Sequence, residues 1–175
     1  VDAGGSFVTP GLIDIHTHSD LTLLVESGAA STVAQGVTTQ VIGNCGVSAA
    51  PTRGREIYYG PLDPTMTRGL ECDWIGLGDY FQRLEAEGVG TNVASLVGHG
   101  NIRVAAMGYD DRPPTPAEME HMKKLVGRAM ADGALGLSSG LAYAPGPYAA
   151  LDELVELGKI VGEYGGIYTS HIRNQ

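Results

Sequence analysis

The sequence has few cysteines, few basic residues and no long apolar run. Two cysteines in 175 residues are too few for a disulfide framework, so a reducing, cytoplasmic location is expected. Twenty acidic residues outnumber 11 lysines and arginines, and the net charge of −9 argues against nucleic-acid or anionic-membrane partners. No segment approaches the ~20 apolar residues that span a bilayer. No basic region followed by an apolar core opens the chain, as a secretory signal would.

Glycine is abundant instead, and it separates short apolar segments from amphipathic ones. The 26 glycines follow no fixed period, which indicates many tight turns. Short apolar runs are typical of parallel strands buried on both faces, and five are predicted, at 12–18, 38–43, 93–97, 134–138 and 167–171. Helices are predicted between them at 27–35, 79–87, 116–131 and 148–164, with Leu151, Leu154 and Leu157 facing inward in the last.

This alternation of strand and helix indicates an α/β fold, either a doubly wound sheet or a (β/α)₈ barrel. A barrel needs about 250 residues, or roughly 31 for each strand and helix. Five such units take about 155 residues, so the chain is expected to be the first five-eighths or so of a TIM-like barrel. The irregular segment 51–73 is predicted to be a long loop, either a lid or a plain surface excursion.

Two histidines close the first predicted strand. Side chains alternate along a strand, so Asp14, His16 and His18 share one face while Ile13 and Ile15 share the other. The isoleucines are expected to pack on the helix layer, which turns both imidazoles toward the barrel interior. Two imidazoles two residues apart can converge on one cation, so we favour a metal site over a pair of structural core histidines.

Other residues at strand ends have roles that the residues alone leave open. Cys45, between glycines after the second strand, is compatible with a metal ligand, an activated nucleophile or a small buried side chain. His171 ends the fifth strand as a ligand or a core histidine. His99 is expected near the site without ligating, and His121 on a solvated helix face. Cys72 has acidic neighbours and is given no role.

These motifs together resemble a known family. The run from Thr9 to Asp20, with its His-x-His, resembles the opening strand of the amidohydrolase superfamily of metal-dependent hydrolases. Over nearly all 175 residues the chain is similar to the N-acyl-D-amino-acid deacylases, or D-aminoacylases. The Asn44-Cys45-Gly46 element discriminates, because most amidohydrolases carry a carboxylated lysine or a glutamate there. Further matching segments are 35–39, 98–100 with Arg103, 133–141, 143–146 and 171–173.

The resemblance implies a zinc site. Cys45 and His171 would hold a tightly bound zinc ion, and His16 and His18 would line an adjoining second-metal position. Tyr143 matches a tyrosine that contacts the substrate. Thiolate and imidazole suit zinc better than Mg²⁺ or Ca²⁺.

Other charged residues have weaker assignments. Arg173 would support the negative charge of the substrate, although a structural salt bridge explains it better. Asp14 and Asp20 would hold the ligands through hydrogen bonds or serve the fold alone.

Parts of the family pattern are missing from the sequence. These are a third zinc-ligating histidine from the sixth strand, an aspartate from the eighth strand that acts as general acid/base, and an arginine that binds the substrate carboxylate. No catalytic acid/base is therefore assigned within the chain. Residues 1–10 are expected to be the tail of a preceding β-sandwich domain, and 11–175 the first part of the catalytic barrel.

The expected activity of the intact protein is zinc-dependent hydrolysis of the amide bond of N-acyl-D-amino acids, giving a carboxylate and a D-amino acid. The alternatives are a dihydroorotase-like or hydantoinase-like hydrolase of cyclic amides, a hydrolase with Cys45 as nucleophile, and a catalytically incomplete metal-binding remnant. An open set of five strands exposes two edges, so the chain alone is expected to self-associate and to be inactive.

Overall fold

The computed structural model describes residues 2–54, 56–60, 67 and 69–174 as an α/β protein with parallel strands. The strands pair in chain order within two three-stranded sheets. The first sheet contains β1 (Leu12–Asp14), β2 (Val37–Ile42) and β3 (Asn92–Ser95), and the second contains β4 (Val97–Gly98), β5 (Gly136–Gly140) and β6 (Ile167–His171). The predicted α/β class is therefore confirmed.

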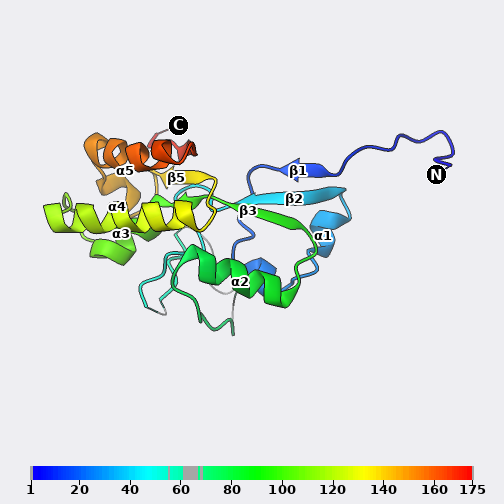
Figure 1. Ribbon diagram of the computed structural model, residues 1–175, viewed down its shortest axis with the longest axis horizontal. Helices are drawn as coiled ribbons and strands as arrows, with labels where there is room; N and C mark the ends of the chain where they lie inside the picture. The colour runs from blue at the N-terminus through cyan, green and yellow to red at the C-terminus, as the bar shows by residue number, and fades with distance from the viewer. Residues whose placement is uncertain (1, 55, 61–66, 68, 175) are drawn as a thin grey trace.

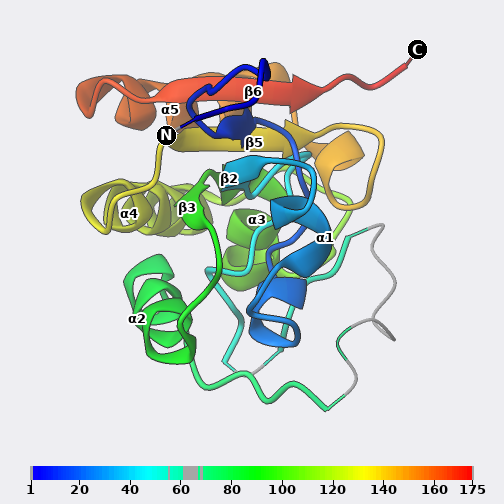
Figure 2. The same cartoon turned by 90° about the vertical axis from the view of Figure 1, so that its right-hand side faces the viewer.

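One residue links the two sheets. Leu96 lies between β3 and β4, and its N–H donates to the Ile42 carbonyl at 2.9 Å. On the other side, the Leu135 N–H donates to the Ser95 carbonyl at 2.8 Å. The segment 92–98 thus joins the β2 side to the β5 side, so the strands follow one another from β1 to β6. Figure 1 shows β1, β2 and β3 side by side, and Figure 2 shows β5 beside β6.

The four predicted helices are present in the expected order, and one further helix lies between the second and third of them. Those of two turns or more are α2 (Leu77–Glu87), α3 (His99–Met107), α4 (Pro116–Ala131) and α5 (Leu151–Glu163), while α1 (Ala30–Val33) and the 3₁₀ turns η1 (Thr22–Leu24) and η3 (Gly146–Tyr148) are short. The bounds of α4 match the prediction, and α5 begins later because η3 occupies the residues before it. The helix α3 was not predicted.

The apolar core lies between the strands and these helices. Ile42, Val97 and Leu137 from the strands are fully buried, as are Met122 and Leu157 from α4 and α5. Helix α4 packs against both α3 and α5, as Figure 1 shows. All five residues of β5 are buried, so the prediction of strands covered on both faces is confirmed there. Among the described residues, no helix is both long and apolar enough to span a membrane.

The prediction for the first strand is wrong in two respects. Strand β1 ends at Asp14, whose Oδ1 accepts the backbone N–H of His16 at 3.0 Å and so forms a turn, although the Thr17 N–H still donates to the Val41 carbonyl of β2 at 3.2 Å. Ile13 and Ile15 are 63% and 74% exposed, so within the described residues no helix covers them. Figure 1 shows β1 and the preceding tail on the side away from α3, α4 and α5. Leu151, predicted to face inward, is also exposed.

The described part of the loop at 51–73 packs on the body of the protein. Tyr58 is buried against Val47 and Val104, and its hydroxyl donates to the Ala144 carbonyl at 2.8 Å. The Thr52 N–H donates to the Ile75 carbonyl at 3.0 Å. The segment is therefore fastened at Tyr58, while residues 55, 61–66 and 68 of this predicted loop lie outside the described residues.

Candidate metal centre

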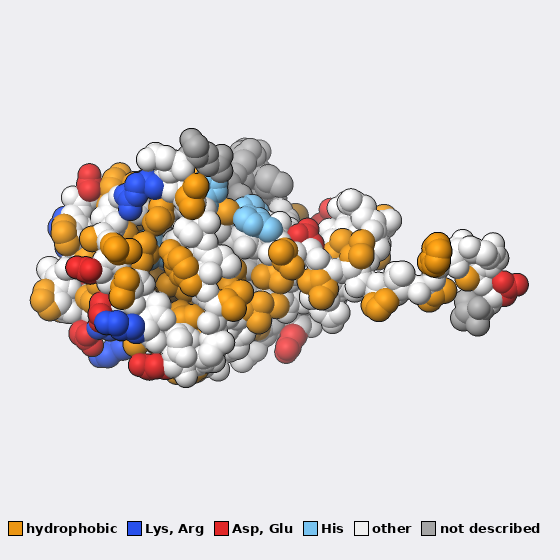
Figure 3. All heavy atoms as spheres, turned by 90° about the horizontal axis from the view of Figure 1, so that it is seen from above, with side chains coloured by type: hydrophobic (Ala, Val, Ile, Leu, Met, Phe, Trp, Pro, Cys, Tyr) orange, Lys and Arg blue, Asp and Glu red, His pale blue; other side chains and the backbone are white. Residues whose placement is uncertain are grey.

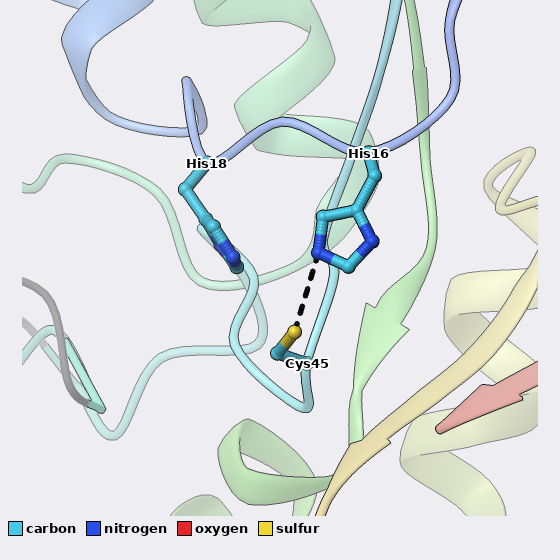
Figure 4. Close-up of side chains that lie close together, drawn as sticks. All are labelled: His16, His18 and Cys45. Carbon is cyan, nitrogen blue, oxygen red and sulfur yellow. Dashed lines mark hydrogen bonds between the residues drawn. The ribbon is translucent and has the colours of Figure 1, made fainter. Parts of the chain in front are cut away.

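Two loops bring three predicted ligands together. His16 and His18 follow β1, and Cys45 lies in the turn after β2. Their ligand atoms all lie within 4.8 Å of one another, and within the described ranges this is the one group of three or more such side chains at that spacing. The Cys45 Sγ is 3.3 Å from the His16 Nε2, and Figure 4 shows the three side chains converging. They form the centre of the candidate site.

The end of β6 adds the fourth predicted ligand. The His171 Nδ1 lies 3.8 Å from the Cys45 Sγ, and its Nε2 lies 3.3 Å from the Tyr143 hydroxyl. The rings of Tyr143 and His171 lie 4.8 Å apart. Pale blue histidine side chains gather on one open face in Figure 3. The structure therefore places all four predicted ligands and the predicted substrate-contacting tyrosine side by side.

The turn that carries Cys45 has an unusual backbone. Gly43, Cys45 and Gly46 all have left-handed φ, at 77°, 54° and 76°. For a residue with a Cβ, this conformation costs roughly 1–2 kcal/mol, so surrounding contacts must hold Cys45 in it. Position 46 requires glycine because a Cβ there would lie 2.5 Å from the Gly140 nitrogen. Strand β5 thus packs directly against the turn, and on its other side Gly140 pairs with His171.

The electrostatics of the site favour the uncharged forms of its donors, the neutral imidazole of His18 and the neutral thiol of Cys45. Burial, and then the charge of His16, lower the pKa of His18 below its ordinary value. The His18 Nδ1 is buried and has no hydrogen-bond partner among the described residues. Burial also raises the pKa of the Cys45 thiol, because desolvation disfavours the charged thiolate. Nitrogen lone pairs and a sulfur without a counter-charge are suited to binding a soft cation such as zinc.

The two nearby aspartates accept hydrogen bonds from backbone N–H groups rather than from imidazole rings. The Asp14 Oδ1 accepts the His16 N–H, and the Asp20 Oδ1 accepts the Gly43 N–H at 2.8 Å. Asp20 is buried, and burial raises its pKa to about 7 despite its backbone hydrogen bonds. Both carboxylates therefore shape the loops that carry the donors.

The remaining candidates lie outside this cluster. The Arg173 guanidinium donates to the carbonyls of Pro147 and Ala149, at 2.5 and 3.1 Å, so its contacts among the described residues are with backbone rather than with the carboxylate of a salt bridge. His99 is buried, with its Nε2 2.7 Å from the Glu153 Oε1. His121 is exposed, as predicted.

Two further buried residues, Cys72 and Ser138, differ in their relation to the site. The thiol of Cys72 contacts the Trp74 carbonyl at 3.4 Å inside the core, in keeping with the absence of a predicted role. Ser138, at the carboxyl end of the predicted strand 134–138, was given no role, yet its hydroxyl bonds the Cys45 turn. Its place at a strand end was the one signal in the sequence that pointed to it.

Comparisons with known proteins place this site in a family. The model of the amidohydrolase family matches residues 1–159. The chain belongs to this family. The N-acyl-D-glutamate deacylase of Alcaligenes xylosoxydans xylosoxydans is 40% identical over 184 residues, covering 100% of this chain and 35% of the relative. The predicted resemblance to the N-acyl-D-amino-acid deacylases is therefore confirmed.

Solved structures agree. The N-acyl-D-glutamate deacylase of Bordetella bronchiseptica, in complex with zinc and a phosphonate inhibitor that mimics the tetrahedral intermediate, has a TM-score of 0.84 and 40% identity, covering 94% of this chain and 34% of that one. A D-aminoacylase studied for its binuclear metal centre has a TM-score of 0.83 and 35% identity, with the same coverage of 94% and 34%. The chain thus spans about a third of the length of the proteins it matches.

Proposed function

We propose that the full-length protein containing this amidohydrolase chain is a zinc-dependent hydrolase of N-acyl-D-amino acids, small molecules that it cleaves to a carboxylate and a D-amino acid. The observation that carries the proposal is the convergence of His16, His18, Cys45 and His171 on one point. The deacylases to which the chain is similar, one of them a zinc complex, support the substrate class.

The donor set fits zinc. Cys45 and His171 would hold the tightly bound ion, and His16 and His18 would line a second position. The buried His18 Nδ1 without a partner is the kind of atom that a cation satisfies. When bound, zinc supplies a Lewis acid that lowers the pKa of water and polarises a carbonyl group. The third histidine, the general acid/base aspartate and the carboxylate-binding arginine of the family pattern are assigned to segments outside this chain.

Tyr143 is proposed to contact the substrate. Its hydroxyl lies 3.3 Å from the His171 Nε2, at the rim of the donor cluster, where it can donate a hydrogen bond to an acyl oxygen. A contact between Arg173 and the substrate stays a prediction. The hydrogen bonds from its guanidinium to Pro147 and Ala149 favour a role in holding the loop before α5.

We infer a barrel from the strand order. Parallel strands that follow one another from β1 to β6, with β3 and β4 counted as one strand because only Leu96 separates them, are compatible with the first five units of a (β/α)₈ barrel over 11–175, with 1–10 as the tail of a preceding β-sandwich. Leu12, Ile13 and Ile167 are more than half exposed at the outer strands, so the 175 residues alone should self-associate. Sedimentation velocity should show oligomers, and a stable monomer would contradict this. A reducing, cytoplasmic location would keep Cys45 available as a ligand.

Zinc analysis of cysteine variants tests the function. In the full-length protein, Cys45→Ala should abolish zinc retention after gel filtration and the release of D-amino acid from N-acetyl-D-amino acids. Cys72→Ala is the matched control, because it removes the other buried cysteine, which contacts the Trp74 carbonyl. Undiminished zinc in Cys45→Ala would refute the ligand assignment.

A cysteine nucleophile is the alternative that one observation favours. The distance of 3.3 Å between the Cys45 Sγ and the His16 Nε2 is compatible with a thiol activated by an imidazole. Burial raises the pKa of this thiol, however, which disfavours the thiolate that a nucleophile needs. Chelation separates the two mechanisms, because a thiol hydrolase keeps its activity in chelator and a zinc hydrolase loses it.

A further inference from the structure

We propose that Ser138 of β5 is a positioning residue that sets the geometry of Cys45 as a metal ligand, an inference that rests on the proposed function. Its hydroxyl accepts the N–H of Gly46 at 2.9 Å and donates to the carbonyl of Gly43 at 2.5 Å. These two residues flank the turn that carries Cys45. Because Ser138 is fully buried, bulk water does not compete for either bond.

The other side-chain hydrogen bonds that hold the turn act on its first half. The Asp20 Oδ1 accepts the Gly43 N–H, and the Asn44 Nδ2 donates to the Val41 carbonyl at 2.9 Å. On the far side, the Gly46 carbonyl accepts the backbone N–H of Gly100. Among the described residues, Ser138 is the side chain whose hydrogen bonds reach both sides of Cys45.

Both bonds oppose the relaxation of a strained backbone. Cys45 and its two glycine neighbours in the turn keep left-handed φ values, which a cysteine in a free loop would leave. Without the hydroxyl, the Gly43 carbonyl and the Gly46 N–H lose a buried partner, and the turn can open. The Cys45 Sγ would then leave its position between His16 and His171. Ser138 thus acts through Cys45 and touches neither substrate nor metal.

The position of the Cys45 sulfur can be measured by replacing zinc with Co²⁺ in the full-length protein. A thiolate bound to Co²⁺ gives a charge-transfer absorption that depends on the sulfur–metal contact. The wild-type protein should show the band, and Ser138→Ala should weaken it and lower the affinity for Co²⁺ at least tenfold. Ser138→Thr keeps the hydroxyl and should restore both. Ser139→Ala is the matched control, since this neighbour is equally buried but bonds Tyr168 and Ser170 on β6.

The outcomes separate the two proposals. If wild type and Cys45→Ala give the same spectrum, Cys45 is not a ligand and the proposed site fails. If Cys45→Ala abolishes the band but folded Ser138→Ala keeps wild-type intensity and affinity, the positioning role is overturned while the function stands. If Ser138→Ala does not fold, amide hydrogen exchange in the wild-type protein tests the positioning role instead. Zinc should slow exchange of the Gly46 N–H at least tenfold, and equal rates with and without zinc would overturn the role.

Discussion

Two side-chain clusters that contain histidine lie just beyond parallel strands of this fold, and they differ in the residues that surround the imidazole rings. Beyond β4, His99 and Arg103 share the carboxylate of Glu153, at 2.7 and 2.6 Å, and all three side chains are buried. Burial alone would raise the pKa of Glu153, but the hydrogen bonds and charges of its two partners outweigh it and hold the pKa below the ordinary value. This cluster carries its own counter-charge.

The cluster of His16, His18, Cys45 and His171 carries none. Within the described residues its side chains contact one another and Tyr143, and the nearby Asp14 and Asp20 bond backbone instead. The comparison shows that the side chains around a histidine at a strand end determine the role of its imidazole. An imidazole bonded to a buried carboxylate serves the fold, whereas imidazoles beside a sulfur and no acid can bind a cation, as proposed for this cluster.

Removing the shared carboxylate should produce the largest loss of stability. Glu153→Gln leaves the Arg103 charge buried without its partner, so the free energy of unfolding should fall by about 3–5 kcal/mol. Urea denaturation measures it, while zinc per folded molecule should not change. Glu156→Gln is the control, because it lies on the same helix and bonds Lys123 and Lys159 near the surface. If Glu153→Gln lost less free energy of unfolding than Glu156→Gln, the shared carboxylate would not distinguish the two clusters.

Removing a donor from the other cluster should affect metal binding instead. His16 is exposed, so His16→Ala should change the stability of the zinc-free protein by less than about 1 kcal/mol. We expect the affinity for the second zinc equivalent to fall at least about 100-fold, or about 2.7 kcal/mol. Calorimetric titration measures it, with the exposed His121→Ala as control. Unchanged affinity for both equivalents would show that His16 is not a ligand.

The sequence predicted the elements that local signals define. Helix α4 begins at its capping box, where the Thr115 N–H donates to Glu118 at 2.7 Å, and this signal needs no tertiary information. Helix α3 was missed because seven of its nine residues are buried, so it has no amphipathic period, and glycine at position 100 lowers its helix propensity. Strand β1 ends earlier than predicted, where the His16 N–H donates to the Asp14 carboxylate, a hydrogen bond that the alternation of side chains does not reveal.

The site was predictable in its donors and not in their supports. His16, His18, Cys45 and His171 carry recognisable motifs, although 126 residues separate the last two. Parallel strands bring such residues to one edge, which is why motifs at strand ends sufficed. The partner of His99 is 54 residues away on α5, and that of the Cys45 turn is a serine on β5. No periodicity in the sequence pairs residues at such separations.

A second buried carboxylate, that of Asp20, sharpens the comparison through pH. Glu153 has cationic partners, but Asp20 has backbone donors only, and burial raises its pKa to about 7 from 3.8. Between these values the folded protein binds a proton that the unfolded chain releases, so this group makes stability fall as pH rises. The lowered pKa of His18 acts in the opposite direction below pH 6.5, so the wild-type curve combines both.

The variant Asp20→Asn isolates the Asp20 contribution. Its amide oxygen still accepts the Gly43 N–H. Relative to the variant, zinc-free wild type should lose about 2 kcal/mol of stability between pH 5 and pH 8. Urea denaturation at the two pH values measures this difference, and parallel curves would contradict the raised pKa.

The smallest effect should come from the loop at 51–73, which contacts the site from outside both clusters. The Tyr58 hydroxyl donates to the Ala144 carbonyl, next to Tyr143, and burial raises the pKa of the phenol so that it stays a donor. Tyr58→Phe should lower the free energy of unfolding by about 1 kcal/mol. Because Tyr143 loses a neighbour's support, kcat/KM of the full-length protein for its proposed substrates, N-acetyl-D-amino acids, should fall a few-fold.

Tyr109→Phe is the control for this change, since its half-exposed ring packs on Tyr58 at 6.0 Å and removing its hydroxyl leaves the Ala144 bond in place. Its stability should stay within about 0.5 kcal/mol of wild type. Equal kcat/KM in both variants would mean that the loop supports the fold but not Tyr143. If kcat/KM falls in Tyr58→Phe but not in Tyr109→Phe, the loop helps to hold the donor cluster in place, as Glu153 on α5 holds His99.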